Sequence, residues 1–506
     1  MKLSKTDFLI FKECQKNAWL KIHRPDIYFK YPLSAFEKNI IETGNEIDEM
    51  ARQLFPGGVL VKSREDSKST QKLIAERTSV IYQPVFASEK FLAVSDILVW
   101  NKETEKYDLY EVKSSTVSEE DGGRKTEDYL VDMAFQKRVI LETGIMSGEI
   151  SLGQTYLVRL NKEYIRRGEL NVFGLFKVEN LTKEVDEILK EIGAEMDSAF
   201  EVLSSEKEPP GHCGCILKGR GSHCTTSEYS NADIPEYSVH DIARIGNSKK
   251  KLKELVDSSI LNIADIPQDF ELSEIQRRQV DTAQSGRTYI DRAGISEFLA
   301  TIKYPVAFLD YETYPSALPR FDGYRPYQQI PFQFSLHVME KPGGELLHYD
   351  FIHAEDTCPD EAFVSSLQKD LPKFGSILVW NMKFEKGINA QIAERQPKFA
   401  KFLKEVNDRV VDLMIPFYGK TLVYDHPKFY GSASIKYVLP ALVPELSYKN
   451  LHIQEGGTAS DTWNRIVSGE YGAEEKECEI RALLDYCGQD TLAMVEIWRV
   501  LEGESK

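Results

Sequence analysis

The sequence predicts a mixed α/β protein, because strand and helix patterns alternate along most of the chain. In the first half, residues 91–100 and 107–113 have the apolar composition of strands, and residues 128–143 repeat apolar side chains at helical spacing. In the second half, a strand pattern at residues 304–309 precedes a long amphipathic helix pattern at residues 479–500. Such alternation favours α/β or α+β architecture over an all-β fold.

The length of 506 residues predicts two to four domains at roughly 150 residues per domain. We expect a first domain over residues 1–240, a helical connector over residues 241–300 and a second large domain over residues 301–506. Hydrophobic residues make up 42% and charged residues 28% of the chain. These ordinary globular values exclude collagen-like, low-complexity and wholly disordered classes.

The net charge of −17 comes from 80 acidic and 63 basic residues, and it excludes a uniformly basic nucleic-acid-binding coat. Local basic surfaces remain compatible with it. Residues 1–30 carry seven Lys or Arg against three Asp or Glu, so this segment could position a phosphate backbone. An ordinary solvated helix face is the alternative interpretation.

The sequence predicts no membrane span, because no stretch approaches 18 apolar residues. The basic start is followed by an apolar run at residues 8–11, which is too short for a secretory signal. Seven cysteines in a large chain without such a signal favour a reducing compartment. We therefore expect a cytoplasmic protein.

Three polar side chains mark the first pair of predicted strands. Asp96 interrupts an apolar run, and Glu111 and Lys113 are two apart, so they share one face of a strand. Two carboxylates can hold a divalent cation that polarises a phosphodiester, and a lysine can stabilise the developing negative charge. The alternative is an exposed strand pair with a surface salt bridge. An Asp96 buried in a strand favours the metal site, because an unpaired buried carboxylate costs several kcal/mol.

Asp96, Glu111-Val112-Lys113 and Gln136, in this order, resemble the core of the PD-(D/E)XK nucleases of the RecB type. The nearest similarity is to the iron–sulfur branch that includes AddB and the CRISPR-adaptation nucleases. The resemblance implies that Asp96 and Glu111 bind a catalytic Mg²⁺ or Mn²⁺. It also implies that Lys113 and Gln136 complete the catalytic set.

Two positions depart from that branch. Asp48 stands where the branch often has a histidine, and Ile140 stands where it often has a tyrosine. Asp48 is a weak candidate ligand, and the metal geometry is expected to differ from that of the branch. Taken alone, a mid-helix glutamine such as Gln136 is most often solvated.

Four cysteines form a second pattern. Cys213, Cys215 and Cys224 cluster after a Pro-Pro turn, and Cys14 is expected on an N-terminal helix, pointing inward. In the iron–sulfur nucleases that the chain resembles, a [4Fe–4S] cluster ties the N-terminal helix to the end of the domain. Four thiolates satisfy that ligand count. The resemblance therefore implies a [4Fe–4S] cluster on these four cysteines.

Zinc is the alternative occupant, because His212 and His223 border the cysteines and tetrahedral zinc is often held by cysteine and histidine together. The C-x-C spacing also departs from the C-x-x-C that is usual in the branch. The other three cysteines are expected to bind no ligand: Cys358, Cys478 and Cys487.

A second set of carboxylates lies in the C-terminal half. Asp310 and Glu312 share one face of a predicted strand, and Glu385 follows an Asn-x-x-Phe step after another strand pattern. Tyr486 and Asp490 are four residues apart in a helix pattern, so they lie on the same helix face.

This second set resembles the active site of the DEDD exonuclease superfamily, which has an RNase H-like fold. The resemblance implies hydrolysis at a 3′ end with two Mg²⁺ or Mn²⁺ ions. The four carboxylates would hold these two ions roughly 3.5–4 Å from each other. It implies that Tyr486 positions the attacking water. Glu385 stands where the family normally has Asp. Asp412 is either an additional ligand or a helix-start cap.

The whole chain resembles an uncharacterised bacterial family that joins a RecB-like iron–sulfur nuclease region to a DEDD-type 3′–5′ exonuclease-like region. We therefore expect a metal-dependent deoxyribonuclease that acts on single-stranded or free DNA ends in repair, recombination or defence. RNA is not excluded as a substrate, and the sequence identifies no protein partner. The alternative is a nucleic-acid-binding or complex-organising protein in which one or both nuclease sites are inactive.

Overall fold

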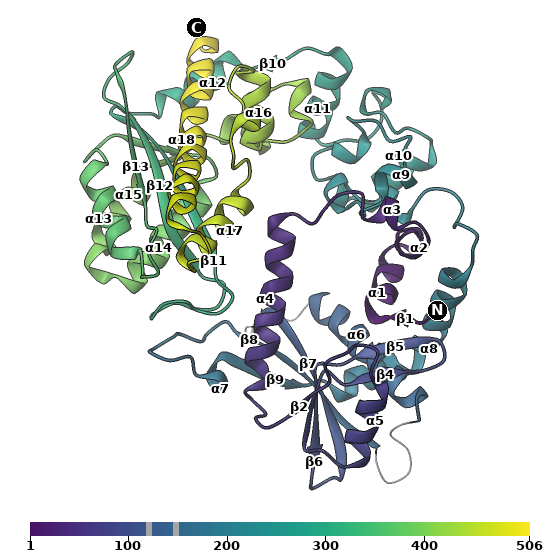
Figure 1. The fold of residues 1–506 in the computed structure, drawn as a ribbon. Helices are drawn as coiled ribbons and strands as arrows, with labels where there is room; N and C mark the ends of the chain where they lie inside the picture. Colours follow the sequence, from purple (N-terminus) through teal and green to yellow (C-terminus); the bar gives the residue numbers. More distant parts are fainter. Residues whose placement is uncertain (118–123, 145–150) are drawn as a thin grey trace. The chain divides into compact units, whose positions relative to one another are not determined.

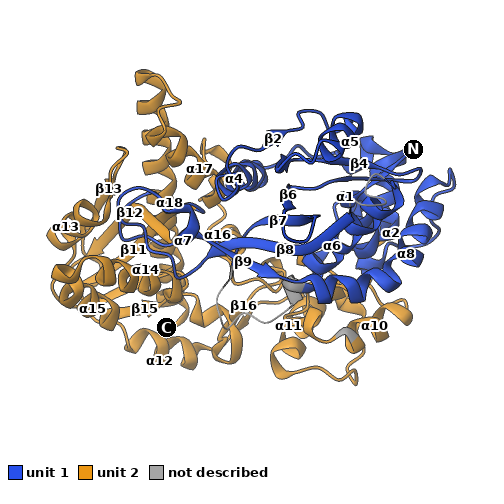
Figure 2. Cartoon of the chain, turned by 90° about the horizontal axis from the view of Figure 1, so that it is seen from below, with its two compact units in different colours: residues 1–216, 222–232, 317–327 blue, residues 217–221, 233–316, 328–506 orange. Residues whose placement is uncertain are grey.

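The computed structural model describes residues 1–117, 124–144 and 151–506 (Figure 1). The chain divides into two compact units, which are coloured separately in Figure 2. Unit 1 comprises residues 1–216, 222–232 and 317–327, and unit 2 comprises residues 217–221, 233–316 and 328–506. The segment expected as a connector, residues 241–300, belongs to unit 2. None of the described helices combines the length and apolarity needed to cross a membrane.

A six-stranded sheet forms the centre of unit 1, in the order β2-β3-β6-β7-β8-β9. Its strands are β2 (Val59–Leu60), β3 (Val80–Tyr82), β6 (Ile97–Asn101), β7 (Lys106–Val117), β8 (Ser151–Asn161) and β9 (Phe176–Asn180). β7 pairs antiparallel with β6 and parallel with β8. A separate sheet has the order β1-β5-β4, with β1 (Leu3–Ser4), β5 (Phe91–Val94) and β4 (Val85–Ala87).

Helices flank both faces of this sheet. The helices of unit 1 are α1 (Lys5–Glu13), α2 (Gln15–His23), α3 (Pro25–Tyr28), α4 (Ala35–Arg52), α5 (Ser67–Ala75), α6 (Arg124–Glu142), α7 (Val172–Leu175), α8 (Thr182–Ser204) and α9 (Ser227–Ser230). Along β7, Tyr107 and Leu109 pack in a core with α6 and α8, whereas Tyr110 and Val112 pack in a core with α4. Because successive strand residues alternate between faces, Glu111 continues the series that faces α6.

Two predicted elements of unit 1 differ from the structure. The expected strand at residues 91–100 is divided between β5 and β6, which belong to different sheets. Asp96 lies in the link, where its carbonyl accepts a hydrogen bond from the Gln83 amide (2.8 Å). Cys14 is not inside a helix but separates α1 from α2 in an extended conformation (φ −161°, ψ 105°). Neither break contains the glycine or proline that usually marks the end of an element, so the sequence pattern did not reveal them.

A five-stranded mixed sheet forms the centre of unit 2, in the order β13-β12-β11-β14-β15. Its strands are β11 (Val306–Pro315), β12 (Gln329–Met339), β13 (Leu346–Ile352), β14 (Ser376–Val379) and β15 (Val410–Asp412). β12 pairs antiparallel with β11 and β13, while β14 pairs parallel with β11 and β15. A short ribbon pairs β10 (Tyr289–Ile290) with β16 (Tyr424–Asp425). The mixed α/β class predicted from the sequence is confirmed.

The helices of unit 2 are α10 (Lys249–Asp257), α11 (Glu274–Ser285), α12 (Arg292–Ala300), α13 (Asp360–Asp370), α14 (Met382–Arg395), α15 (Ala400–Arg409), α16 (Ile435–Leu442), α17 (Gly456–Val467) and α18 (Ala473–Glu504). α18 lies on one face of the sheet and α13, α14 and α15 lie on the other (Figure 1). Phe308 of β11 contacts Trp498 of α18, whereas Tyr311 contacts Phe363 of α13. By alternation, Asp310 lies on the α18 face of β11.

Hydrogen bonds fix α18 against the sheet close to Asp310. Gln333 of β12 donates to the Leu483 carbonyl (2.7 Å), and the Ser335 and Thr491 hydroxyls lie 2.7 Å apart. All four residues are inaccessible or nearly so, and a buried hydrogen bond is costly to break. The position of α18 along β12 is therefore well defined.

Candidate functional site

The first carboxylate set lies between β7 and α6 of unit 1. Glu111 faces α6, and Gln136 and Asp132 are four residues apart on the facing side of that helix. The Gln136 amide donates to Glu111 Oε2 (2.7 Å) and to Asp132 Oδ1 (2.8 Å). All three side chains are at most 2% exposed. Gln136 is thus a buried bridge between two carboxylates and not a solvated residue.

Two lysines neutralise this pair of carboxylates. Lys113 forms ion pairs with Glu111 and with Asp132 Oδ2 (2.6 Å). Lys5 of α1 lies 2.9 Å from Glu111 Oε1 and 3.2 Å from Asp132 Oδ1. Burial alone would raise the pKa of Glu111, but Lys113 and Lys5 outweigh it and hold that pKa below its usual value. The sequence did not predict Lys5 or Asp132 as members of this site.

Asp96 lies beside this pair but is held by the backbone. Its Oδ2 accepts a hydrogen bond from the Val112 amide (2.7 Å). Burial, and then the charge of Glu111, raise the pKa of Asp96 well above its usual value, and Asp48 adds in the same direction. The Gln83 side-chain amide donates a hydrogen bond to Asp48 Oδ2 (3.1 Å). Asp48 Oδ1 has no hydrogen-bond partner among the described residues. The structure therefore brings Asp48 and all four predicted residues together.

The second carboxylate set lies between β11 and α18 of unit 2. The ligand atoms of Asp310, Glu312 and Cys487 all lie within 4.8 Å of one another. The Tyr448 hydroxyl donates to Asp490 Oδ1 (2.5 Å). Glu312 and Asp490 are each 9% exposed. Tyr448 precedes α18 by many residues and carries no motif, so the sequence did not predict it.

The carboxylates of this second site lie close enough to raise one another's pKa values. Burial, and then Asp490, raise the pKa of Asp310, and burial, Asp310 and Asp490 raise that of Glu312. Burial raises the pKa of Asp490 to about 6 although Tyr448 opposes the shift. The exposed Lys436 is the cation that lowers the pKa of Glu312 and Asp490. Carboxylates crowded in this way repel one another unless protons or cations compensate them.

Glu385 and Tyr486 complete the second set. Glu385, in the first turn of α14, is 1% exposed, and its Oε2 has no hydrogen-bond partner among the described residues. Burial, and then Asp310, raise the pKa of Glu385, which places the two carboxylates in the same electrostatic environment. Burial, and then Asp490, raise the pKa of Tyr486. The structure thus brings all five predicted residues of this site together.

Asp412 has the capping role that was the alternative to metal binding. Its two carboxylate oxygens accept hydrogen bonds from the backbone amides of Asn381 and Met382, each 3.2 Å long, at the start of α14. The Met414 amide also donates to it (3.0 Å). A carboxylate at a helix start compensates the free backbone amides there. Asp412 therefore orients the helix that carries Glu385.

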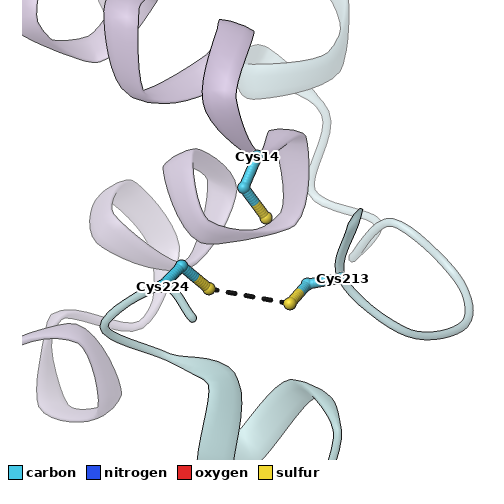
Figure 3. Close-up of side chains that lie close together, drawn as sticks. All are labelled: Cys14, Cys213 and Cys224. Atoms are coloured by element: carbon cyan, nitrogen blue, oxygen red, sulfur yellow. Dashed lines mark hydrogen bonds between the residues drawn. The ribbon is translucent and has the colours of Figure 1, made fainter. Parts of the chain in front are cut away.

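Three of the four predicted cysteines, Cys14, Cys213 and Cys224, lie close together in unit 1 (Figure 3). The sulfur of Cys224 lies 3.6 Å from that of Cys213 and 3.5 Å from that of Cys215. The ligand atoms of Cys14, Cys213 and Cys224 lie within 4.8 Å of one another. Cys14 reaches this group because it caps α2, where the Asn17 amide donates to its sulfur (3.4 Å).

The sulfur separations fit a single tetrahedral ion. Zn–S bonds of about 2.3 Å place tetrahedral sulfurs about 3.8 Å apart. Sulfurs that each bind a different iron of a cluster lie farther apart, because the cluster occupies the space between them. The Asn231 amide donates to the sulfurs of Cys213 (3.2 Å) and Cys215 (3.4 Å), as expected for thiolate ligands.

The cysteine group is mostly buried, and among the described residues no histidine belongs to it. Hydrogen bonds from Cys213 and Cys224 lower the pKa of Cys14 to about 3. His223, in contrast, has its Nδ1 3.2 Å from the Ser227 hydroxyl. A cavity of about 680 Å³ borders Cys14 and Cys213 and offers an ion a path to the sulfurs.

The two groups of potential metal ligands found in the described ranges are the cysteines and the set of Asp310, Glu312 and Cys487. The set around Glu111 is not among them. The geometry therefore distinguishes the second carboxylate set, which lacks compensating cations in close contact, from the first, in which two lysines already contact the carboxylates.

A family described as "Domain of unknown function (DUF2779)" matches residues 307–434. This region contains Asp310, Glu312 and Glu385 but ends before Tyr486 and Asp490. A search of curated proteins finds no match.

Proposed function

We propose that the protein is a metal-dependent nuclease whose hydrolytic centre is formed by Asp310, Glu312, Glu385 and Asp490. The observation that carries this proposal is the convergence of four carboxylates from three segments, β11, α14 and α18, on one poorly solvated spot, with raised pKa values. Buried carboxylates are costly unless a function retains them. Divalent cations are the partners that such oxygen ligands prefer.

Mg²⁺ or Mn²⁺ bound here would lower the pKa of a water molecule and stabilise the leaving oxygen of a phosphodiester. Asp310 and Glu312 would hold the ions from the sheet, and Asp490 from α18. The Tyr448 hydroxyl fixes the orientation of the Asp490 carboxylate through its short hydrogen bond. Tyr486, on the same helix face as Asp490, would orient the attacking water.

The proposed substrate is DNA with single-stranded or free ends, and RNA remains a second substrate to test. This assignment rests on the resemblance to the DEDD exonucleases and to the RecB-type nucleases. Repair, recombination or defence are the processes in which such an enzyme would act, and the reducing cytoplasm is the proposed location.

The set around Glu111 supports a different role for unit 1. Lys5 and Lys113 already neutralise Glu111 and Asp132, and a backbone amide holds Asp96. We therefore propose that cleavage depends chiefly on the second set and that the first contributes to nucleic-acid binding. A nucleic-acid-binding protein with both sites inactive is the second candidate function.

We further propose that the four cysteines hold one structural metal ion. Zinc fits the sulfur separations of 3.5 and 3.6 Å better than the [4Fe–4S] cluster that the family resemblance implies. Such an ion would join the start of α2 to the segment that carries Cys213 and Cys215.

The test is cleavage of 5′- and 3′-labelled single- and double-stranded DNA and RNA with Mg²⁺ or Mn²⁺. Asp310→Asn should reduce the rate about 100-fold or more, because it removes a metal ligand. Lys113→Ala should reduce it much less. Asp350→Asn, an exposed carboxylate on β13, and Lys106→Ala, an exposed lysine on β7, are the matched controls. No cleavage of any substrate by the wild type, with metal-independent DNA binding, would favour the second candidate function.

A further inference from the structure

Cys487 lies inside the carboxylate site of unit 2, although the sequence predicted an unliganded cysteine there. Its side chain is fully buried, and its sulfur lies 3.6 Å from Asp310 Oδ2. The other two cysteines outside the cysteine group, Cys358 and Cys478, are exposed. Cys487 is thus set apart by both its burial and its neighbours.

The surroundings of Cys487 are not those of a cysteine that packs as a small apolar residue. Asp310, Glu312 and Asp490 all act on its thiol electrostatically. Buried unliganded cysteines usually lie among apolar side chains. A thiol within 4.8 Å of the carboxylate oxygens of Asp310 and Glu312 instead resembles one member of a set of cation ligands.

A second observation points to a cation-binding role for this group. Glu385 Oε2 is buried and has no hydrogen-bond partner among the described residues, and Asp310 acts on this carboxylate. A buried polar atom left without a partner costs free energy comparable to a lost hydrogen bond or more. An ion placed among these groups would remove that cost.

The helix geometry allows the thiol and a carboxylate to serve one ion. Cys487 and Asp490 are three residues apart on α18, so they lie on the same face. That face meets Asp310 and Glu312 on β11, and the ligand atoms of Cys487, Asp310 and Glu312 fall within 4.8 Å of one another. No rearrangement of either element is needed to bring sulfur and oxygen ligands together.

We propose that Cys487 is a thiolate ligand of this site and makes it select a thiophilic transition ion, such as Co²⁺ or Zn²⁺, over Mg²⁺. Carboxylates alone suit Mg²⁺, whereas a thiolate favours softer ions. On binding, the sulfur–metal bond forms and the thiol proton is released to solvent, so the thiol binds as a thiolate. The inference rests on the proposed function for its relevance to cleavage, but the binding itself does not.

The direct test is an anaerobic Co²⁺ titration of the 506-residue chain. The cysteine group is first saturated with zinc, so that it does not bind the added Co²⁺. The wild type should gain a thiolate-to-cobalt charge-transfer absorption that Cys487→Ser and Asp310→Asn both lack. Cys478→Ser, an exposed cysteine on the same helix, should keep it. Circular dichroism checks that each variant is folded. The same absorption gain in Cys487→Ser as in the wild type, or no gain in the wild type, would overturn the inference.

The serine variant also separates two roles of the thiol. Serine keeps a hydrogen-bond donor towards Asp310 but loses the sulfur ligand, so a thiol that only donates would be replaced without consequence. We expect the ratio of the Co²⁺-supported to the Mg²⁺-supported cleavage rate to fall about tenfold in Cys487→Ser. An unchanged ratio, with no cobalt absorption, overturns the inference and leaves the nuclease proposal intact. Cobalt absorption as expected in a chain that cleaves nothing supports the inference and rejects the nuclease proposal.

Discussion

Similar residue types have opposite electrostatic environments at the two carboxylate sites. Glu111 is contacted by Lys5 and Lys113, and its pKa is low because these two charges outweigh its burial. Asp310 has a thiol within 3.6 Å, and its pKa is high because burial and Asp490 act together. Local charge compensation, rather than the motif itself, is therefore the property that distinguishes the two sites.

Asp132→Asn tests the compensation at the first site. The substitution removes one of the two anions that Lys5 and Lys113 share, and we expect the free energy of unfolding to fall by roughly 2 kcal/mol, allowing for the partial exposure of both lysines. Asp128→Asn, an exposed carboxylate one turn earlier on α6, is the matched control and should change stability by less than about 0.5 kcal/mol. Urea unfolding measures both. Equal effects would show that Asp132 is not a buried ion-pair partner.

The raised pKa of Asp490 predicts how the stability of the metal-free protein depends on pH. Its pKa is raised from 3.8 to about 6, so between these values the folded chain holds a proton that the unfolded chain has lost. Stability should therefore fall as the pH rises through this window. Between about pH 4.5 and about pH 7, Asp490→Asn should remove about 2 kcal/mol of that fall, since one pKa unit corresponds to about 1.4 kcal/mol.

Urea unfolding in metal-free buffer at about pH 4.5 and about pH 7 measures this difference. Addition of Mn²⁺ at the higher pH should stabilise the wild type more than the variant, because a bound ion replaces the proton. An identical pH dependence in the wild type and Asp490→Asn would contradict the raised pKa.

At the scale of elements, the alternation of strand residues was the most informative sequence pattern. It placed Glu111 with Lys113, and Asp310 with Glu312, on common faces, and the structure has these pairs on β7 and β11. The contacts that alternation cannot reveal are those between distant segments. Lys5 is 106 residues from Glu111, and no local pattern marks either the break at Cys14 or the approach of Tyr448.

The cysteine group gives a prediction about the elements that it joins. Full-length protein should contain one zinc ion per chain in the cysteine group and be colourless, and Cys14→Ser should lower the zinc content and the stability of unit 1. Cys358→Ser, an exposed cysteine in unit 2, is the control. Elemental analysis and visible absorption measure the outcome. A brown protein with iron and acid-labile sulfide would instead support the cluster.

At the scale of the molecule, each unit has its own hydrophobic core and its own candidate metal site. We therefore expect two calorimetric transitions, because units with separate cores can unfold separately. A zinc chelator should lower the midpoint of one transition. Mn²⁺ should raise the midpoint of the other, and Asp310→Asn should abolish that increase. A single transition that responds to both treatments would contradict independent unfolding.

Helix α1 begins at Lys5 and ends immediately before Cys14, so one short helix has a lysine that contacts Glu111 at one end and a member of the cysteine group just after the other. In an α-helix, each residue adds about 1.5 Å of rise and about 100° of rotation. The number of residues in α1 therefore fixes the distance and the rotation between the Lys5 ammonium group and the Cys14 sulfur. Deletion of any one residue of α1 would rotate Lys5 by about 100° relative to Cys14. Only one of these two side chains could then keep its contacts.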